Sequence, residues 1–183
     1  MSTEIPYECY KILAQNLNCT PQDLRMNIER EISRFFYEIQ KDYKPPFSVV
    51  EPANLAGIYK FRPVPFLNGG GGALYPNSLG ERDFKILMGD EDPLEEKRFV
   101  VAHETGHSLL EWNAEGHKKV IPDGERYEDA SDYLARIILM PAWDFTERAK
   151  ELNYNTPELS KLYVCPKYAV EERIKDLGVY KFR

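Results

Sequence analysis

Two histidines and a glutamate, His103, Glu104 and His107, form the pattern H-E-x-x-H, and the chain contains only one other histidine. Side chains four residues apart lie on one face of an α-helix, so both imidazoles can reach a single ion. Neutral imidazole nitrogens bind zinc at about 2.0–2.1 Å, and a hydrolytic zinc site keeps one position for water. Glu104 follows the first histidine and can act as a general base toward that water. The segment therefore predicts a catalytic metal site, against the alternative of a chance match on an amphipathic helix.

A catalytic zinc needs a third protein ligand, and Glu128, 21 residues after His107, can provide it. Glu128 and Asp132 are four residues apart, so Glu128 can coordinate the ion while Asp132 accepts the outer N–H of a ligating histidine. The metzincin spacing would require a histidine where Asn113 stands, and the reversed H-x-x-E-H order is absent. The alternative interpretation is two solvated carboxylates on a surface helix. The requirement for three ligands favours the metal site.

The chain resembles the ImmA/IrrE family of metallo-endopeptidases in two segments, FVVAHETGHSLL and EDASDYLARIILMP. The members of that family read roughly A-H-E-x-G-H and then E-x-E-A-N-x-F-A-x-x-L-L-M-P. With the shared Met-Pro endings aligned, the family's first glutamate falls on Glu128 and its Asn or Asp falls on Asp132. The family's second glutamate falls on Ala130, so this chain lacks that carboxylate. The resemblance covers roughly residues 45–180 and implies a zincin fold and a zinc-dependent endopeptidase, often one that cuts helix-turn-helix repressors.

The expected ion is zinc, although two imidazoles and a carboxylate also accept manganese or iron. Two other functions stay open: a non-catalytic, metal-stabilised binding module that sequesters a regulatory or toxin partner, and a metal hydrolase acting on a non-peptide bond. The presence of Glu104 favours the peptidase over the binding module, because a structural zinc needs no base and usually has four protein ligands. A second group that stabilises the oxyanion is also expected. His117 and Tyr75 are both candidates, and their spacing does not choose between them.

Capping residues predict the helix that carries the H-E-x-x-H pattern and the helix that carries Glu128 and Asp132. Asp92 is a good cap, Pro93 suits the first helical position and Glu95 occupies the capping-box position of the helix that holds the H-E-x-x-H pattern. Asp123 can cap the next helix, which ends at Pro141 and carries the predicted third ligand. The loop over residues 113–122 connects the two.

The rest of the chain alternates between apolar helical and strand patterns. The run of glycines at residues 69–72 fits a hairpin connection or bulge, because no Gly-Lys-Ser/Thr follows to complete a phosphate loop. Thr20 and Pro21 begin a helix that ends before the Pro45-Pro46 pair. The other predicted helices are 4–17, 48–56, 142–152 and a two-helix pattern within 156–178, and the predicted strands are 57–63, 73–76 and 84–88.

These elements predict an α+β fold. The resemblance makes it zincin-like, with an active-site helix pair packed on a small, mostly antiparallel sheet and with additional N- and C-terminal helices. A chain of 183 residues is long enough for one domain with a substantial core. We therefore expect N-terminal helices over residues 1–44 to pack on a zincin-like metallopeptidase domain over residues 45–183, which ends in a helical segment.

The amino-acid composition limits which binding partners and which cellular compartment are expected. A net charge of −6 and a pI near 5.2 argue against a nucleic-acid-binding surface, and the charges of the closing two-helix pattern nearly cancel. Three widely spaced cysteines indicate neither a disulfide framework nor a cysteine metal site. No secretory signal and no bilayer-spanning apolar run is visible. We expect a soluble cytoplasmic protein that acts on a protein or peptide, the resemblance pointing to a helix-turn-helix repressor, without membrane or direct nucleic-acid binding.

Overall fold

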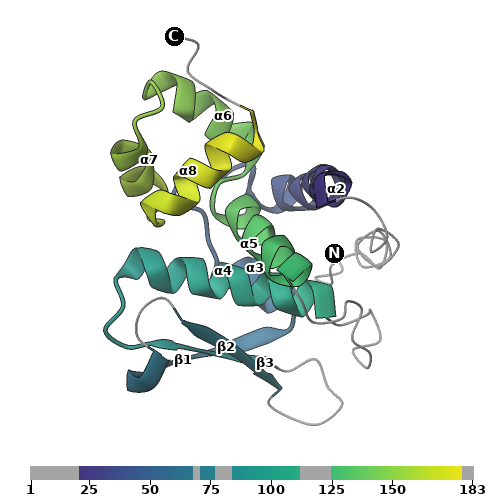
Figure 1. The fold of residues 1–183 in the computed structure, drawn as a ribbon, viewed down its shortest axis with the longest axis vertical. Coiled ribbons are helices and arrows are strands. Elements are labelled where there is room, and N and C mark those ends of the chain that lie inside the picture. Colours follow the sequence, from purple (N-terminus) through teal and green to yellow (C-terminus); the bar gives the residue numbers. More distant parts are fainter. Residues whose placement is uncertain (1–20, 68–70, 77–83, 112–124, 179–183) are drawn as a thin grey trace.

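The computed structural model describes residues 21–67, 71–76, 84–111 and 125–178. The helix expected over residues 4–17 and the loop expected over residues 113–122 lie outside the described residues. A central helix, α4 (Leu94–Glu111), lies with the sheet on one side and α5 (Glu125–Leu139) on the other. Figure 1 shows these layers, with the sheet below α4 and α5 above it. The α+β architecture predicted from the sequence is confirmed.

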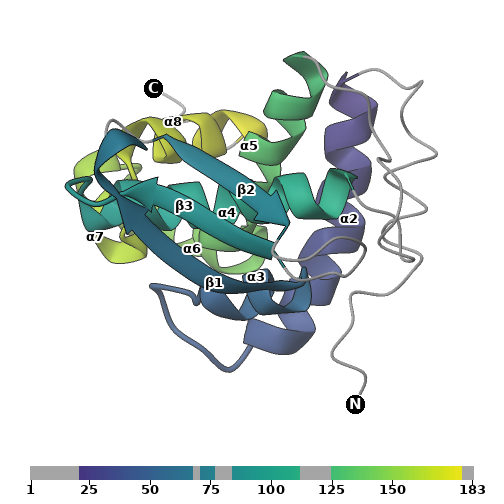
Figure 2. The same cartoon turned by 90° about the horizontal axis from the view of Figure 1, so that it is seen from below.

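The sheet has three strands in the order β1-β3-β2, made of β1 (Ile58–Val64), β2 (Gly72–Pro76) and β3 (Phe84–Gly89). β2 pairs antiparallel with β3, but β1 pairs parallel with it, so the sheet is mixed rather than mostly antiparallel. The order in which the chain enters the sheet explains why β1 is parallel to β3 while β2 is antiparallel to it. The chain reverses direction once between β1 and β2 and again between β2 and β3, and β3 then enters between the other two strands. Figure 2 looks onto this sheet.

The core lies between the sheet and α4. β3 alternates in burial, with Phe84, Ile86 and Met88 directed into the core, as a half-buried strand should. α4 is buried almost all round from Phe99 onward, with His103 as the half-buried exception. A helix covered on both sides needs apolar or small residues on every face. The H-E-x-x-H pattern therefore lies on the most enclosed helix of the described chain.

β1 follows the predicted strand, with one irregularity at its start. Ile58 is buried and Phe61 packs against the core, as the sequence indicates. The register shifts between Ile58 and Lys60, so Tyr59 is an extra residue in this strand. Such a bulge bends a strand and strengthens its twist.

The long helix α2 (Pro21–Gln40) begins at the predicted proline and packs against α5. Its Glu29 carboxylate accepts two hydrogen bonds from the Arg173 guanidinium, at 2.7 and 2.9 Å, and one from the Tyr133 hydroxyl at 2.9 Å. Burial on its own would raise the pKa of Glu29, but the charge and hydrogen bonds of Arg173 outweigh it and lower that pKa. One ionic cluster thus joins α2, α5 and the last helix.

Three further helices follow α5, and two short helical elements flank β1, one before it and one after it. In Figure 1 the three C-terminal helices lie together beyond one end of α5. Within the described ranges, every helix is too short or too polar to span a membrane. The bounds are α3 (Val50–Leu55), η2 (Pro65–Leu67), α6 (Ala142–Glu151), α7 (Thr156–Tyr163) and α8 (Lys167–Asp176).

Candidate metal centre

α4 places the two histidines of the pattern on one face, as their spacing predicts. The Nε2 atoms of His103 and His107 are 2.8 Å apart, and the two rings meet nearly edge to face with centroids 4.5 Å apart. His107 is buried and His103 half-buried. Both imidazoles therefore direct a ring nitrogen at the same point.

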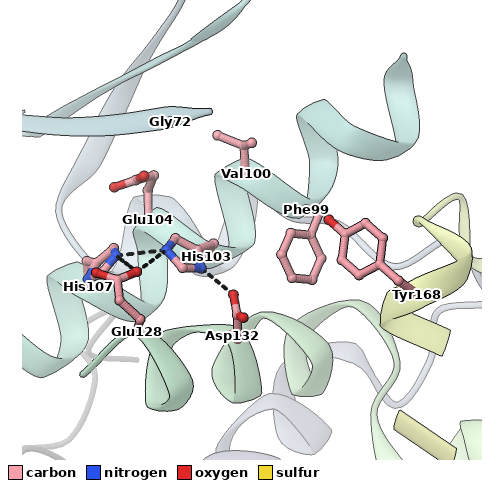
Figure 3. A pocket seen from close by; sticks show the side chains of 9 residues that line it. All are labelled: Gly72, Phe99, Val100, His103, Glu104, His107, Glu128, Asp132 and Tyr168. Carbon is pink, nitrogen blue, oxygen red and sulfur yellow. Dashed lines mark hydrogen bonds and ion pairs between the residues drawn. The ribbon is translucent and has the colours of Figure 1, made fainter. Parts of the chain in front are cut away.

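Glu128 reaches that point from α5. Its Oε2 atom lies 3.3 Å from His103 Nε2 and 3.5 Å from His107 Nε2, and its side chain is 61% exposed. One atom from each of the three side chains lies within 4.8 Å of the others, which makes them a candidate metal-binding group among the described residues. Figure 3 shows the carboxylate beside the two rings, with dashed lines that join it to both. The convergence of side chains from two separate helices agrees with the ligand set inferred from the sequence.

The outer nitrogens of both rings are held by α5. Asp132 Oδ1 lies 2.7 Å from His103 Nδ1, in the position expected for it, and the Ser131 hydroxyl oxygen lies 3.1 Å from His107 Nδ1. The sequence reasoning missed Ser131. Its position three residues after Glu128 was the available signal, because residues at i, i+3 and i+4 share one face of a helix. Together, Glu128, Ser131 and Asp132 of α5 thus contact both histidines.

The chemistry of these donors fits a divalent cation. When each Nδ1 carries its proton toward α5, both Nε2 atoms present lone pairs to each other and to Glu128. Two lone pairs at 2.8 Å repel unless a cation or a proton lies between them. Burial alone would lower the pKa of His103, but its hydrogen bond to Asp132 and the charges of Asp132, Glu104 and Glu128 raise it. The same carboxylates that favour a proton here favour a metal cation.

Two imidazoles and one carboxylate are the ligands of many hydrolytic zinc sites, with a fourth position left for water or substrate. Manganese and iron accept the same donors, so the set does not determine the identity of the ion.

Glu104 lies beside the candidate ligands but outside their group. It is buried, and a Cβ atom added to Gly72 of β2 would be 2.6 Å from its Oε1. Figure 3 shows its carboxylate directed toward β2, away from Glu128. A carboxylate in this place can exchange a proton with a molecule in the cavity without ligating the ion. Gly72 was not singled out in the sequence, although a glycine in a strand often marks the close approach of another group.

The cavity at this site has a volume of about 280 Å³. It extends along α4 past His103 to Phe99 and to Tyr168 of α8. Tyr75 is exposed and does not line the cavity, and strand alternation puts it on the face opposite Gly72. His117, the other candidate for oxyanion stabilisation, lies outside the described residues.

A close approach of the two helices sets the spacing of the site. A Cβ atom at Gly106 would lie 2.9 Å from Ser131 Cα and 3.0 Å from the Ser131 carbonyl oxygen. Glycine inside a helix costs about 1 kcal/mol relative to alanine, which already suggests a packing reason at this position. The missing side chain lets α5 lie close enough to bring Glu128 to both histidines.

Comparison with known families adds one finding. Residues 77–175, more than half of the chain, match the family model Peptidase_M78, described as the IrrE N-terminal-like domain. A search of curated proteins found no match. The matched segment contains both helices of the site and all of α8 except its last residue.

Proposed function

The chain belongs to the Peptidase_M78 family of metallopeptidase domains, and on that premise we propose that it is a zinc-dependent endopeptidase with a zincin-like catalytic arrangement. The observation that carries the proposal is the convergence of His103, His107 and Glu128 next to a carboxylate that is not one of them. A protein substrate follows from the family. The resemblance in the sequence supports a regulatory substrate of the helix-turn-helix repressor type.

His103, His107 and Glu128 would hold the ion. When bound, zinc supplies a Lewis acid that polarises the scissile carbonyl and makes a water molecule more acidic. Glu104 takes the proton of the attacking water on its carboxylate and delivers it to the leaving amine nitrogen. Its burial between α4 and β2 keeps bulk water from competing for that proton.

Asp132 and Ser131 act through the histidines. Asp132 accepts a hydrogen bond from Nδ1–H of His103. This fixes the tautomer in which Nε2 carries the lone pair that can bind a metal, and it also fixes the orientation of the ring. The hydroxyl of Ser131 holds the His107 ring in the same way. We propose that these contacts keep both ligands ready for the ion.

β2 offers a place for the substrate backbone. It is an edge strand in the described sheet, since β3 covers one side of it and no described strand covers the other. An extended peptide that adds to such an edge gains main-chain hydrogen bonds. Because Gly72 of β2 touches Glu104, a peptide on this edge would pass the proposed base.

The test compares cleavage and metal binding in matched variants. We expect Glu104→Gln to retain zinc but to cut a purified helix-turn-helix repressor about 10²- to 10⁴-fold more slowly than the parent, because a general base typically contributes that much. Glu128→Gln should lose both zinc and activity. Glu95→Gln, on the same helix and away from the cavity, is the control and should remain active.

A chelator should stop cleavage by the parent, and added zinc should restore it. If the Glu104→Gln protein cuts as fast as the parent, the role given to Glu104 is wrong. If the parent binds the repressor tightly with zinc but never cuts it, the chain is a metal-stabilised binding module.

A further inference from the structure

The cavity has a second end, one helical turn along α4 from the candidate ligands, and its wall is aromatic. Tyr168, near the start of α8, packs edge to face on Phe99, with ring centroids 5.4 Å apart and an interplanar angle of 73°. Phe99 is only 8% exposed, whereas Tyr168 is 50% exposed. The Tyr168 hydroxyl donates a hydrogen bond of 3.1 Å to Glu96. Figure 3 shows the two rings at this end, beyond His103 and Asp132. Tyr168 is therefore a fixed ring at the edge of the cavity.

The cavity as a whole is also negatively charged. Among the described residues that line the cavity there are three carboxylates and no lysine or arginine. Among the described residues, neither Asp132 nor Glu96 has a lysine or arginine partner, since Asp132 contacts His103 and Glu96 accepts from Tyr168. The three carboxylates exceed the two charges of a divalent cation, and Glu96 adds a fourth beside the aromatic wall. The described residues of the site therefore keep a net negative charge with a divalent metal ion in place.

We propose that the Phe99–Tyr168 end of the cavity is a specificity subsite for an arginine or lysine side chain of the substrate, next to the cleaved bond. The proposal rests on the proposed peptidase function. An apolar side chain would bury the second Asp132 oxygen without a partner, which costs free energy, and an acidic side chain would meet only like charge. A basic side chain can lay its aliphatic stem on the rings and direct its charge to the carboxylates.

Arginine suits the subsite best. A guanidinium stacks on the face of a tyrosine, and its fork of donors matches a carboxylate. A volume of about 280 Å³ leaves room for one such side chain beside the reacting peptide bond. In this arrangement Tyr168 contacts the substrate directly, while Glu96 positions the Tyr168 ring and adds charge.

The experiment measures peptide binding separately from cleavage. Four fluorescein-labelled nonapeptides of alanine, glycine and serine carry arginine, citrulline, phenylalanine or glutamate as their central residue. Their dissociation constants are measured by fluorescence anisotropy with the zinc-loaded, full-length Glu104→Gln protein. Citrulline has the shape of arginine without its charge. We expect the arginine peptide to bind roughly tenfold more tightly than the citrulline peptide, and the glutamate peptide to bind most weakly.

Variants in the same background test which residues cause that preference. Tyr168→Ala should weaken binding of the arginine peptide roughly 3- to 30-fold, as expected for a lost cation–π contact, and Tyr168→Phe should restore most of it. Glu96→Gln should reduce the preference for arginine over citrulline. The matched controls are Tyr59→Ala, at a tyrosine that is 59% exposed on β1, and Glu95→Gln on α4, and both should leave the preference unchanged.

The subsite proposal is refuted if the arginine and phenylalanine peptides bind equally well. It is also refuted if the Tyr168→Ala protein keeps the full preference for arginine over citrulline. If Tyr168→Ala does not fold, the Glu96→Gln measurement decides by the same criterion. The parent protein is then incubated with the same peptides and the products are identified by mass spectrometry. Binding with the expected preference but no cleavage would refute the peptidase function and leave the subsite standing.

Discussion

The close contact between α4 and α5 gives a sharp prediction for Gly106→Ala. The added Cβ would lie 2.9 and 3.0 Å from two backbone atoms of Ser131, whereas ordinary contact begins at 3.4 Å. Backbone atoms cannot rotate away, so the helices must separate by about 0.5 Å. Overpacking of this kind costs about 1–3 kcal/mol, and alanine returns about 1 kcal/mol of helix propensity. We expect a net loss of up to about 2 kcal/mol in the free energy of unfolding.

The same displacement should weaken metal binding. Glu128, Ser131 and Asp132 all belong to the helix that moves, while His103 and His107 stay on α4. Metal sites tolerate errors of about 0.2 Å in ligand distances, which is less than the displacement. We expect the zinc affinity to fall by roughly tenfold or more, similar to the loss of one contact behind a ligand.

Urea unfolding of the metal-free protein measures the stability, and competition with a chelating dye measures the affinity. Gly72→Ala is the contrasting variant, since the three atoms nearest to its Cβ belong to the side chains of Glu104 and Val100 rather than to backbone. It should reduce cleavage about tenfold, because the proposed base must move, and should leave zinc affinity within about twofold of the parent. If Gly106→Ala is as stable as the parent, or more so, and binds zinc equally well, the two helices do not need that contact.

Two further changes have defined outcomes. Asp132→Asn should lower zinc affinity about 10- to 100-fold in dye competition while the fold persists, because it removes the charge behind His103; an unchanged affinity would contradict that role. Glu29→Gln should cost about 3 kcal/mol or more in urea unfolding at pH 7, since it leaves the buried Arg173 without its counter-charge. Because the pKa of Glu29 is lowered in the folded state, the advantage of the parent over this variant is present at neutral pH and should disappear as pH falls through that lowered pKa.

Features set by local spacing were predictable from the sequence. Side chains four residues apart on a helix share a face whatever the rest of the chain does, so Glu128 and Asp132 could be proposed for the site before their helix was placed. The strand predicted over residues 57–63 from its alternation is found at Ile58–Val64, and the strand predicted over residues 84–88 is found at Phe84–Gly89. Periodicity does not specify which strands pair, and the parallel pairing of β1 with β3 depends on the order in which three strands enter the sheet.

Contacts between distant segments left weaker signals. Tyr168 follows Phe99 by many residues and reaches it only because α8 folds back against the start of α4. No spacing rule relates such a pair, and an aromatic residue near a helix start is ordinary in a core. Gly72 and Gly106 left a local signal, because a glycine within a strand or helix costs stability and therefore suggests that another group approaches closely. Those two glycines could have indicated close contacts at β2 and at the H-E-x-x-H helix, although not which segments make them.

The burial of Glu104 and His107 restricts the conformation in which a protein substrate can be cut. Glu104 and His107 are buried, and the cavity holds about 280 Å³. An α-helix with its side chains is about 10–12 Å across, so a folded helix cannot bring its backbone to the buried Glu104 and His107. An extended segment lying along the edge of β2 can do so. A repressor built from helices must therefore be cut in a linker or in a segment that opens locally, and its cleavage rate should follow that opening. Product masses that place the cut inside a stable helix, at a rate independent of substrate stability, would show that the enzyme itself opens to admit the chain.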